Sequence, residues 1–174
     1  AEQRARDHLS QSWSRRLTTR RTLEHRQEGM PVKIASLLGF VLMVAGLLGL
    51  LVTHSLFSVS PVVIGLQAGA VLLMVWARVT FRLRSFHVAA NPTEGSLVTH
   101  GPYRFLRHPI YTAVVLFTFA GALSHPSLGA SGLAVVVLVG ALARMLAEER
   151  LLQVRYLEYA AYASQTKRMI PFLF

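Results

Sequence analysis

The sequence contains no cysteine, which excludes disulfide bonds, thiolate catalysis and cysteine-ligated metal. Charged residues are scarce as well: they make up 15% of the chain, against about 25% in ordinary soluble domains. Neither a phosphate-cradling glycine loop nor a Ser-His-Asp arrangement is recognisable. We expect no metal site, because His87, His100 and His108 lack helical spacing and neighbouring carboxylates. These absences leave a chain whose composition is typical of a membrane protein.

Apolar runs occupy most of the sequence, and 53% of the residues are hydrophobic. The runs are Ile34–Val52, Pro61–Phe81, Ile110–His125 and Leu128–Leu146. The first is long enough to cross a hydrocarbon core of about 30 Å, whereas the third is short for a full span. Leucines and tyrosines alternate with charges over Ala147–Gln165, which predicts an amphipathic cytoplasmic helix. We therefore expect an all-α integral membrane protein with about four transmembrane helices plus this C-terminal helix.

The chain is basic, with 18 Lys and Arg against 8 Asp and Glu and a net charge of +10. The basic residues flank the apolar runs and do not form one patch interleaved with aromatic residues. We therefore expect anionic lipid headgroups as partners, and no nucleic acid. Lys and Arg occur in residues 1–33, in residues 82–107 and from Arg144 onward, but not in the linkers 53–60 and 124–131. By the positive-inside rule, both termini and these polar segments, with any active site that they form, should lie on the cytoplasmic side.

Residues 1–33 form a basic arm with eight Lys or Arg and four acidic residues. Few of its side chains are large and apolar, so we expect the arm either to be disordered or to lie on the membrane surface. The remaining residues, 34–174, form the membrane domain.

One polar block interrupts the apolar sequence. It reads Gly101-Pro102-Tyr103-Arg104-Phe105-Leu106-Arg107-His108-Pro109-Ile110-Tyr111. So many polar groups at a hydrophobic boundary cost free energy unless they are paired or bind a ligand. A cytoplasmic loop that only obeys the positive-inside rule is the alternative. The second polar cluster, Arg144–Arg150, ends the next apolar hairpin on the same side and favours a functional site. Within the block, His108 suits a neutral hydrogen-bonding role better than that of a general base.

Two further patterns carry chemistry. Arg144 and Glu148 are four residues apart and share one helix face, whereas Glu149 lies about 100° round the helix. They either form an ion pair that closes the helix end or bind a ligand. Tyr103 and Tyr111 can stack on a heterocycle or face a cation such as a sulfonium.

These residues resemble the isoprenylcysteine carboxyl methyltransferase family of integral membrane enzymes. The resemblance rests on the block 101–111, on Arg144 with Glu148-Glu149, and on Thr166–Pro171, and it covers roughly residues 95–172. A related block occurs in phospholipid N-methyltransferases and, more distantly, in membrane sterol reductases. The resemblance implies that residues 34–174 are a methyltransferase domain, in which residues 95–172 bind the donor S-adenosylmethionine.

The resemblance also implies roles for single residues. Leu97 and Val98 would line the adenosine side of the donor through their backbone, and Tyr103 would lie on the nucleoside. Glu148 would bind a polar group of the donor, and Arg144 would steer the carboxylate of the acceptor. The implied donor-binding residues are Leu97, Val98, Tyr103, His108, Pro109, Ile110, Tyr111 and Glu148, and the implied catalytic residues are Arg144 and Glu148.

The expected function is methyl transfer from S-adenosylmethionine to a lipophilic, membrane-resident acceptor. An isoprenylcysteine-like carboxylate is the first expectation, because a carboxylate is already a nucleophile. A phospholipid amine is the nearest alternative; Arg144 argues against it, because a guanidinium repels an ammonium group. A nicotinamide-dependent sterol-type reductase would need room for a longer dinucleotide, and the C-terminal region is small for one. The non-enzymatic alternative is a membrane scaffold whose basic arm binds anionic lipid.

Overall fold

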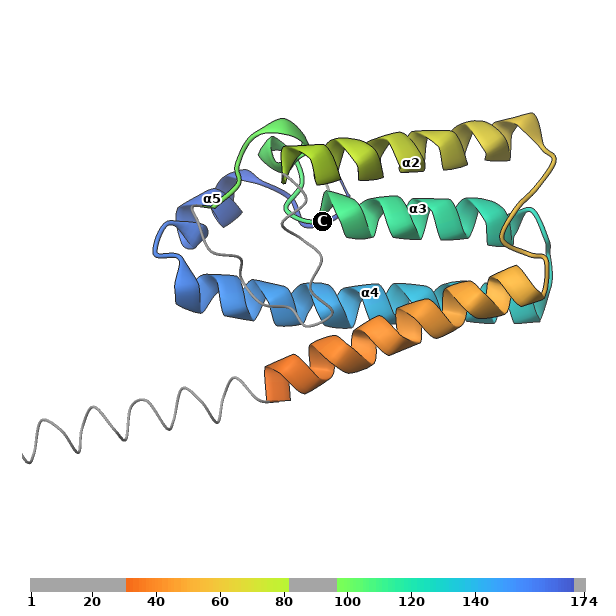
Figure 1. Ribbon diagram of the computed structural model, residues 1–174, viewed down its shortest axis with the longest axis horizontal. Coiled ribbons are helices and arrows are strands. Elements are labelled where there is room, and N and C mark those ends of the chain that lie inside the picture. The colour runs from red at the N-terminus through yellow and green to blue at the C-terminus, as the bar shows by residue number, and fades with distance from the viewer. Residues whose placement is uncertain (1–30, 82–96, 171–174) are drawn as a thin grey trace, which may run out of the picture.

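The computed structural model of the chain describes residues 31–81 and 97–170. The described helices are an N-terminal helix, Pro31–Val52, followed by α2 (Pro61–Thr80), the short 3₁₀ turn η1 (Gly101–Arg104), α3 (Pro109–Leu123), α4 (Leu128–Arg155) and α5 (Tyr159–Gln165) (Figure 1). The described residues contain no strand. Most of the basic arm, and residues 82–96 of the polar segment that precedes the block, lie outside the described residues.

The described helices confirm the expected all-α membrane fold. Pro31–Val52, Pro61–Thr80 and Leu128–Arg155 are long and apolar enough to cross a membrane. The remaining apolar helix, α3, has only 15 residues, as the short third apolar run predicted. Proline at the first turn starts both α2 and α3, where a missing amide donor costs nothing.

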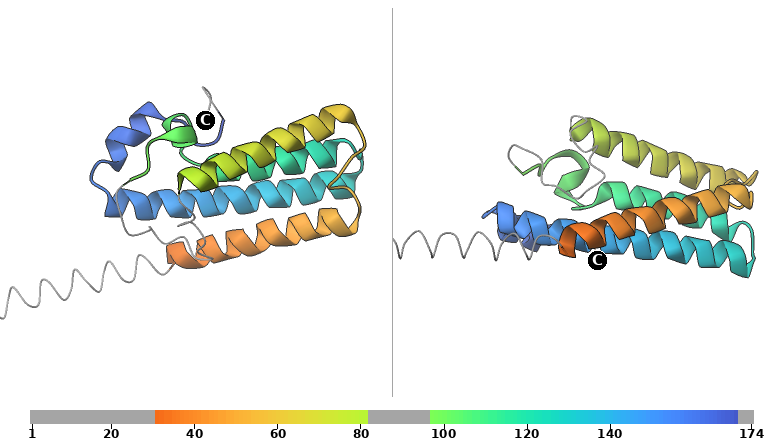
Figure 2. Two further views of the ribbon diagram at one scale, coloured as in Figure 1. Left: turned by 45° about the horizontal axis from the view of Figure 1, so that its top comes forward. Right: turned by 60° about the horizontal axis from the view of Figure 1, so that its bottom comes forward.

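The long helices form a bundle in which α3 lies between α2 and α4 (Figures 1 and 2). The N-terminal helix crosses α4 at a point where both helices carry glycine. A Cβ atom on Gly140 would lie 2.6 Å from the carbonyl oxygen of Gly39, and a Cβ on Gly39 would lie 2.7 Å from that of Gly140. Small residues thus allow the two backbones to approach closely, which is how helices commonly associate in membranes.

The C-terminal part differs in detail from the expected helix over residues 147–165. The fourth helix does not stop at Leu146 but continues to Arg155, because residues 147–153 contain good helix formers and no proline or glycine. The chain then leaves the helix at Tyr156, which has an extended conformation, and α5 turns back over the end of the bundle (Figure 1). The polar face of α4 therefore continues directly from the membrane-spanning part into the site.

The described Lys and Arg residues belong to segments at one end of the bundle, the end that carries α5 (Figure 1). The linkers at the opposite end, 53–60 and 124–127, contain none. The structure thus places all of the polar clusters that the sequence singled out at the same end.

Candidate active site

Gly101 starts the polar block in a conformation that suits glycine. Its φ is +61°, and a Cβ atom there would lie 2.6 Å from the Thr80 hydroxyl at the end of α2. The following turn η1 buries Tyr103, whose ring lies 5.8 Å from the ring of Phe81. A backbone conformation that only glycine adopts without strain therefore places the block in contact with the end of α2.

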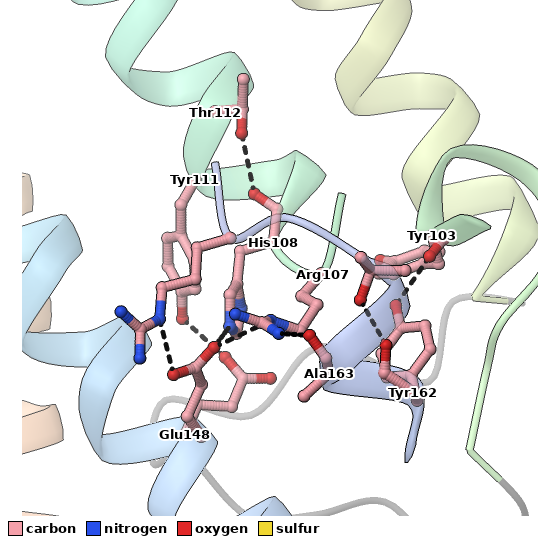
Figure 3. A network of polar contacts seen from close by, with 11 residues as sticks. Tyr103, Arg107, His108, Tyr111, Thr112, Glu148, Tyr162 and Ala163 are labelled. Atoms are coloured by element: carbon pink, nitrogen blue, oxygen red, sulfur yellow. Dashed lines mark hydrogen bonds and ion pairs between the residues drawn. The ribbon is translucent and has the colours of Figure 1, made fainter. Parts of the chain in front are cut away.

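The segment after α5 pairs with the polar block. Main-chain hydrogen bonds of 2.7–3.2 Å join residues 105–108 to residues 167–168 in parallel orientation. One turn further along, the hydroxyl of Thr112 donates to the carbonyl of Met169 over 2.7 Å, and the Met169 side chain is buried against Tyr111. Residues from the two ends of the predicted motif thus form one structural unit, seen in Figure 3.

Glu149 is the centre of a buried charge cluster. Its carboxylate accepts a hydrogen bond of 3.0 Å from Nε of Arg168. Nε of Arg107 and Nε2 of His108 lie 3.1 and 3.4 Å from its other oxygen, at ion-pair distance but without the alignment of hydrogen bonds. Arg107 also donates to the carbonyl of Ala163 in α5. One carboxylate of α4 therefore holds the polar block and the C-terminal segment together.

Glu148, the next residue, has different surroundings. It is only half-buried, and Oε2 accepts a hydrogen bond of 3.0 Å from the hydroxyl of Tyr111 (Figure 3). Among the described residues, the Glu148 carboxylate makes this one hydrogen bond. Its other oxygen, Oε1, can therefore accept a hydrogen bond from a ligand. Glu148 is thus the carboxylate of the pair that is able to bind a ligand.

Two buried tyrosines lie within electrostatic range of the adjacent glutamates. Burial raises the pKa of Tyr103, and the negative charge of Glu148 raises it further. Burial, followed by the charge of Glu149, raises the pKa of Tyr159. Both tyrosines are consequently neutral near pH 7, so each offers a ligand a hydroxyl donor and an aromatic surface, and not a base.

Two tyrosines of α5 contribute to the site in different ways. The Tyr162 hydroxyl donates over 2.7 Å to the carbonyl of Tyr103, which fixes α5 on η1. The hydroxyl of Tyr159 is fully buried and has no hydrogen-bond partner among the described residues. A buried hydroxyl without a partner is costly, so Tyr159 is a candidate to meet a polar group of a ligand.

Arg144 lies against the N-terminal helix. Nη1 is 3.5 Å from the Ser36 hydroxyl, the limit of a hydrogen bond, and the guanidinium lies over the Phe40 ring at 5.1 Å from its centroid. Arg144 and Glu148 are one helical turn apart on α4, as predicted from their spacing. The positive group therefore lies deeper along the helix than the carboxylate.

The other predicted donor-binding residues lie near the polar block, and their roles toward the donor stay predictions. Leu97 and Val98 are half-buried in the non-helical segment before η1. His108 and Pro109 are buried at the start of α3, and Ile110 is half-buried beside them. The structure thus gathers every predicted donor-binding residue at the end of the bundle that carries α5.

Sequence reasoning did not assign a role to several residues of the cluster. These are Arg107, Glu149, Tyr159, Tyr162 and Arg168. Arg107 and Glu149 were visible as charges in the two polar clusters, but nothing in their spacing indicates that they meet. Arg168 and the tyrosines became relevant only because the chain folds back after α4.

The site residues fit S-adenosylmethionine, which is a sulfonium cation with an amino acid part and a nucleoside part. A half-buried carboxylate with an unused oxygen suits its cationic or hydroxyl groups. Buried tyrosine rings suit a sulfonium or an adenine, and the partnerless Tyr159 hydroxyl offers a further donor. The residues present thus match the charge and the aromatic character of the donor.

The comparison with protein families agrees with this chemistry. The family described as phospholipid methyltransferase matches residues 63–158, just over half of the chain. Those residues include nearly all of α2 and the whole of η1, α3 and α4, and so both Arg144 and Glu148. No curated protein and no solved structure matches the chain significantly. The isoprenylcysteine family that the sequence resembled belongs to the same group of integral membrane methyltransferases, but the match is to the phospholipid enzymes. The chain therefore belongs to the phospholipid methyltransferase family, whose members use S-adenosylmethionine, and it is a membrane methyltransferase.

Proposed function

We propose that this protein transfers methyl groups from S-adenosylmethionine to the amine of a phospholipid headgroup. The observation that carries the proposal is the half-buried Glu148 carboxylate, which has an unused oxygen and lies one helical turn from Arg144. The family match to phospholipid methyltransferases supports the same class of acceptor.

Arg144 is compatible with an amine acceptor once the whole headgroup is considered. An ethanolamine phospholipid carries a phosphate and an ammonium group two carbons apart. Residues four apart on a helix have Cβ atoms about 5–6 Å apart, so Arg144 and Glu148 present opposite charges at a similar spacing. Arg144, on the membrane side of Glu148, would bind the phosphate, and the amine would lie beside Glu148, whose carboxylate has lone pairs for both the amine and a polar group of the donor. This assignment reverses our first interpretation, in which Arg144 disfavoured an amine.

The residues of the site supply positioning and charge. S-adenosylmethionine, when bound, supplies a methyl group on a sulfonium sulfur, and this methyl moves to nitrogen as the carbon–sulfur bond breaks. Tyr103 and Tyr111 offer aromatic faces for the sulfonium, and the tyrosine cluster excludes water. The amine also has to lose a proton, and Oε1 of Glu148 is an available acceptor for it or for a water that takes it. Alignment of the two reactants accounts for the larger part of such catalysis.

A second candidate acceptor is an isoprenylcysteine-like carboxylate. It is supported by the guanidinium of Arg144, which pairs well with a carboxylate, and by the sequence resemblance. Such an acceptor needs no proton transfer, because it is already a nucleophile. The two candidates therefore differ in whether the reaction needs a proton acceptor at Glu148.

The product distinguishes the two candidates. Detergent-solubilised protein would be given S-adenosylmethionine with a radiolabelled methyl group, and either dioleoyl phosphatidylethanolamine or an N-acetyl farnesylcysteine. We expect base-stable radiolabel in the phospholipid. A base-labile methyl ester would favour the carboxylate acceptor, and absence of saturable donor binding would contradict the enzyme reading. For variants of Glu148, the control is Glu158→Gln, which removes the carboxylate of an exposed glutamate in the same region.

We also propose that the basic end of the bundle, with the site, faces the cytoplasm and contacts anionic headgroups. The cysteine-free sequence makes this easy to test. Single cysteines would be placed at Leu157, on the site end, and at Val59, in the opposite linker; both are almost fully exposed. A membrane-impermeant maleimide added to intact cells should label Val59→Cys and leave Leu157→Cys unlabelled, with the cysteine-free protein as the blank. The reverse pattern would invert the topology.

A further inference from the structure

An apolar groove opens between three helices below the site. It is lined by four side chains from residues 44–51 of the N-terminal helix, by Ala70, Val71 and Met74 of α2, by three side chains from residues 113–117 of α3 and by Leu56. The groove has a volume of about 460 Å³, within the range of about 300–1,000 Å³ for small-molecule sites. It is too small for another helix, whose diameter is about 10–12 Å. Since all of the lining side chains are apolar, the groove suits hydrocarbon and not a headgroup.

The groove has a buried floor and an open side. Ala70 and Ala113 at the floor are almost fully buried, and their small side chains leave the space. Leu48, Leu51 and Val71 at the rim are about half-exposed. The rim belongs to helices that are long enough to span the membrane, so the open side faces the hydrocarbon region from which a lipid chain would enter.

The groove begins about one helical turn from the candidate active site, both on α3 and on the N-terminal helix. Ala113 and Val114 follow Tyr111 on α3, and Val114 packs against the buried cluster that contains Tyr111. On the N-terminal helix, Phe40 lies under Arg144, one turn before the first groove residue, Val44. From Tyr111 to Phe117, at the far part of the groove, α3 rises by about 9 Å at 1.5 Å per residue. A headgroup at the site would place its attached chain over this groove.

We propose that the groove binds one hydrocarbon chain of the acceptor lipid and thereby selects lipid-linked acceptors over free headgroups. The inference rests on the proposed function for its headgroup, but the groove itself can be tested without turnover. The small alanines of the floor and the absence of polar lining atoms are what a saturated or unsaturated acyl chain needs.

Two variants of α2 separate the groove from the general lipid surface. Val71 lines the groove and is 49% exposed, and the next residue, Leu72, is 69% exposed and lies outside the groove. Val71→Trp should fill the groove and lower kcat/KM for dioleoyl phosphatidylethanolamine by roughly tenfold, the discrimination typical of apolar pockets. The same variant should leave the rate with glycerophosphoethanolamine, which has no acyl chains, unchanged. Leu72→Trp should affect neither acceptor, and equal losses in both variants would overturn the proposal.

Photo-crosslinking tests lipid binding in the groove even if the protein methylates neither acceptor. The probe is a phosphatidylethanolamine with a diazirine near the end of one acyl chain, reconstituted with the intact protein. We expect labelled peptides from residues 44–51 or 113–117 in excess over the lipid-facing residues Val135 and Val139 of α4, and loss of that excess in Val71→Trp. Uniform labelling of the lipid-facing residues would refute the proposal that the groove binds a hydrocarbon chain. If the unaltered protein proves to be a dimer in detergent and Val71→Trp a monomer with unchanged labelling, the groove belongs to an interface with a second copy, which would also overturn the proposal.

Discussion

Tyr111 donates a hydrogen bond of 3.0 Å from its hydroxyl to Oε2 of Glu148, and so connects the start of α3 to α4. This bond orients a carboxylate that otherwise keeps one oxygen for a ligand. The neighbouring Glu149 accepts a hydrogen bond from Arg168 and has Arg107 and His108 at ion-pair distance. We therefore propose separable roles for these adjacent glutamates of one helix, ligand binding for Glu148 and structure for Glu149.

Glu148→Gln should weaken binding of S-adenosylmethionine while changing stability little. The loss of a charge-assisted hydrogen bond costs about 1.5–3 kcal/mol, which is about ten- to a hundred-fold in Kd. Titration calorimetry of the solubilised protein measures the change. Tyr111→Phe should give a smaller loss in the same direction, because the carboxylate remains but is less well oriented. Unchanged donor affinity in Glu148→Gln would remove this residue from the donor site.

Glu149→Gln should have the opposite profile. The substitution leaves the cations of the cluster without their buried counter-charge, which typically costs about 3–5 kcal/mol. We expect a clearly lower melting temperature in thermal unfolding and, as a consequence, loss of donor binding. Comparison with Glu148→Gln is the matched control, since both variants change a carboxylate to an amide on the same turn. A melting curve like that of the unaltered protein would show that the cluster contributes no stability.

These two glutamates also show where sequence analysis succeeds and where it stops. The apolar runs and the basic linkers predicted the helices and the end of the bundle that carries the site, because bilayer thickness and backbone hydrogen bonding leave few alternatives. The spacing of Arg144 and Glu148 predicted their shared face, because helix geometry is local. The different surroundings of Glu148 and Glu149 could not be predicted, because they depend on where residues 105–108 and 167–168 meet in space. The break at Tyr156 also has no local signal, because residues 156–158 contain neither proline nor glycine.

Arg144→Ala should leave donor binding nearly intact and abolish most of the transfer to a phospholipid. The guanidinium is assigned to the acceptor phosphate, and Arg144→Lys should restore only part of the activity, because an ammonium cannot bind a phosphate with two parallel bonds. Donor titration and initial rates at several acceptor concentrations separate the two effects.

Ser36→Ala is the control for Arg144. It removes the 3.5 Å contact with the N-terminal helix but keeps the charge, so transfer should persist. Parallel losses of donor affinity and thermal stability in Arg144→Ala would instead identify Arg144 as a structural residue.

Gly140→Ala should destabilise the bundle. The added methyl would meet the Gly39 carbonyl at 2.6 Å, and the backbones must separate to accept it, at a cost of about 1–3 kcal/mol. Gly65→Ala in α2 is the matched control, because a Cβ there meets nothing within 4 Å and alanine favours the helix. Denaturation of both variants in the same detergent measures the difference, and similar curves would show that the crossing is loosely packed.

The parallel pairing of residues 105–108 with residues 167–168 has a consequence for synthesis in the cell. All of α4 and α5 lies between the two paired segments, so a chain that is still emerging from the ribosome inserts its apolar helices before this pairing can form. The carboxylate of Glu149 therefore lacks its hydrogen bond from Arg168 until Arg168 has been synthesised. Assembly of the methyltransferase centre is thus coupled to completion of the described chain, and a ribosome stalled within α5 would leave a membrane-inserted but inactive protein.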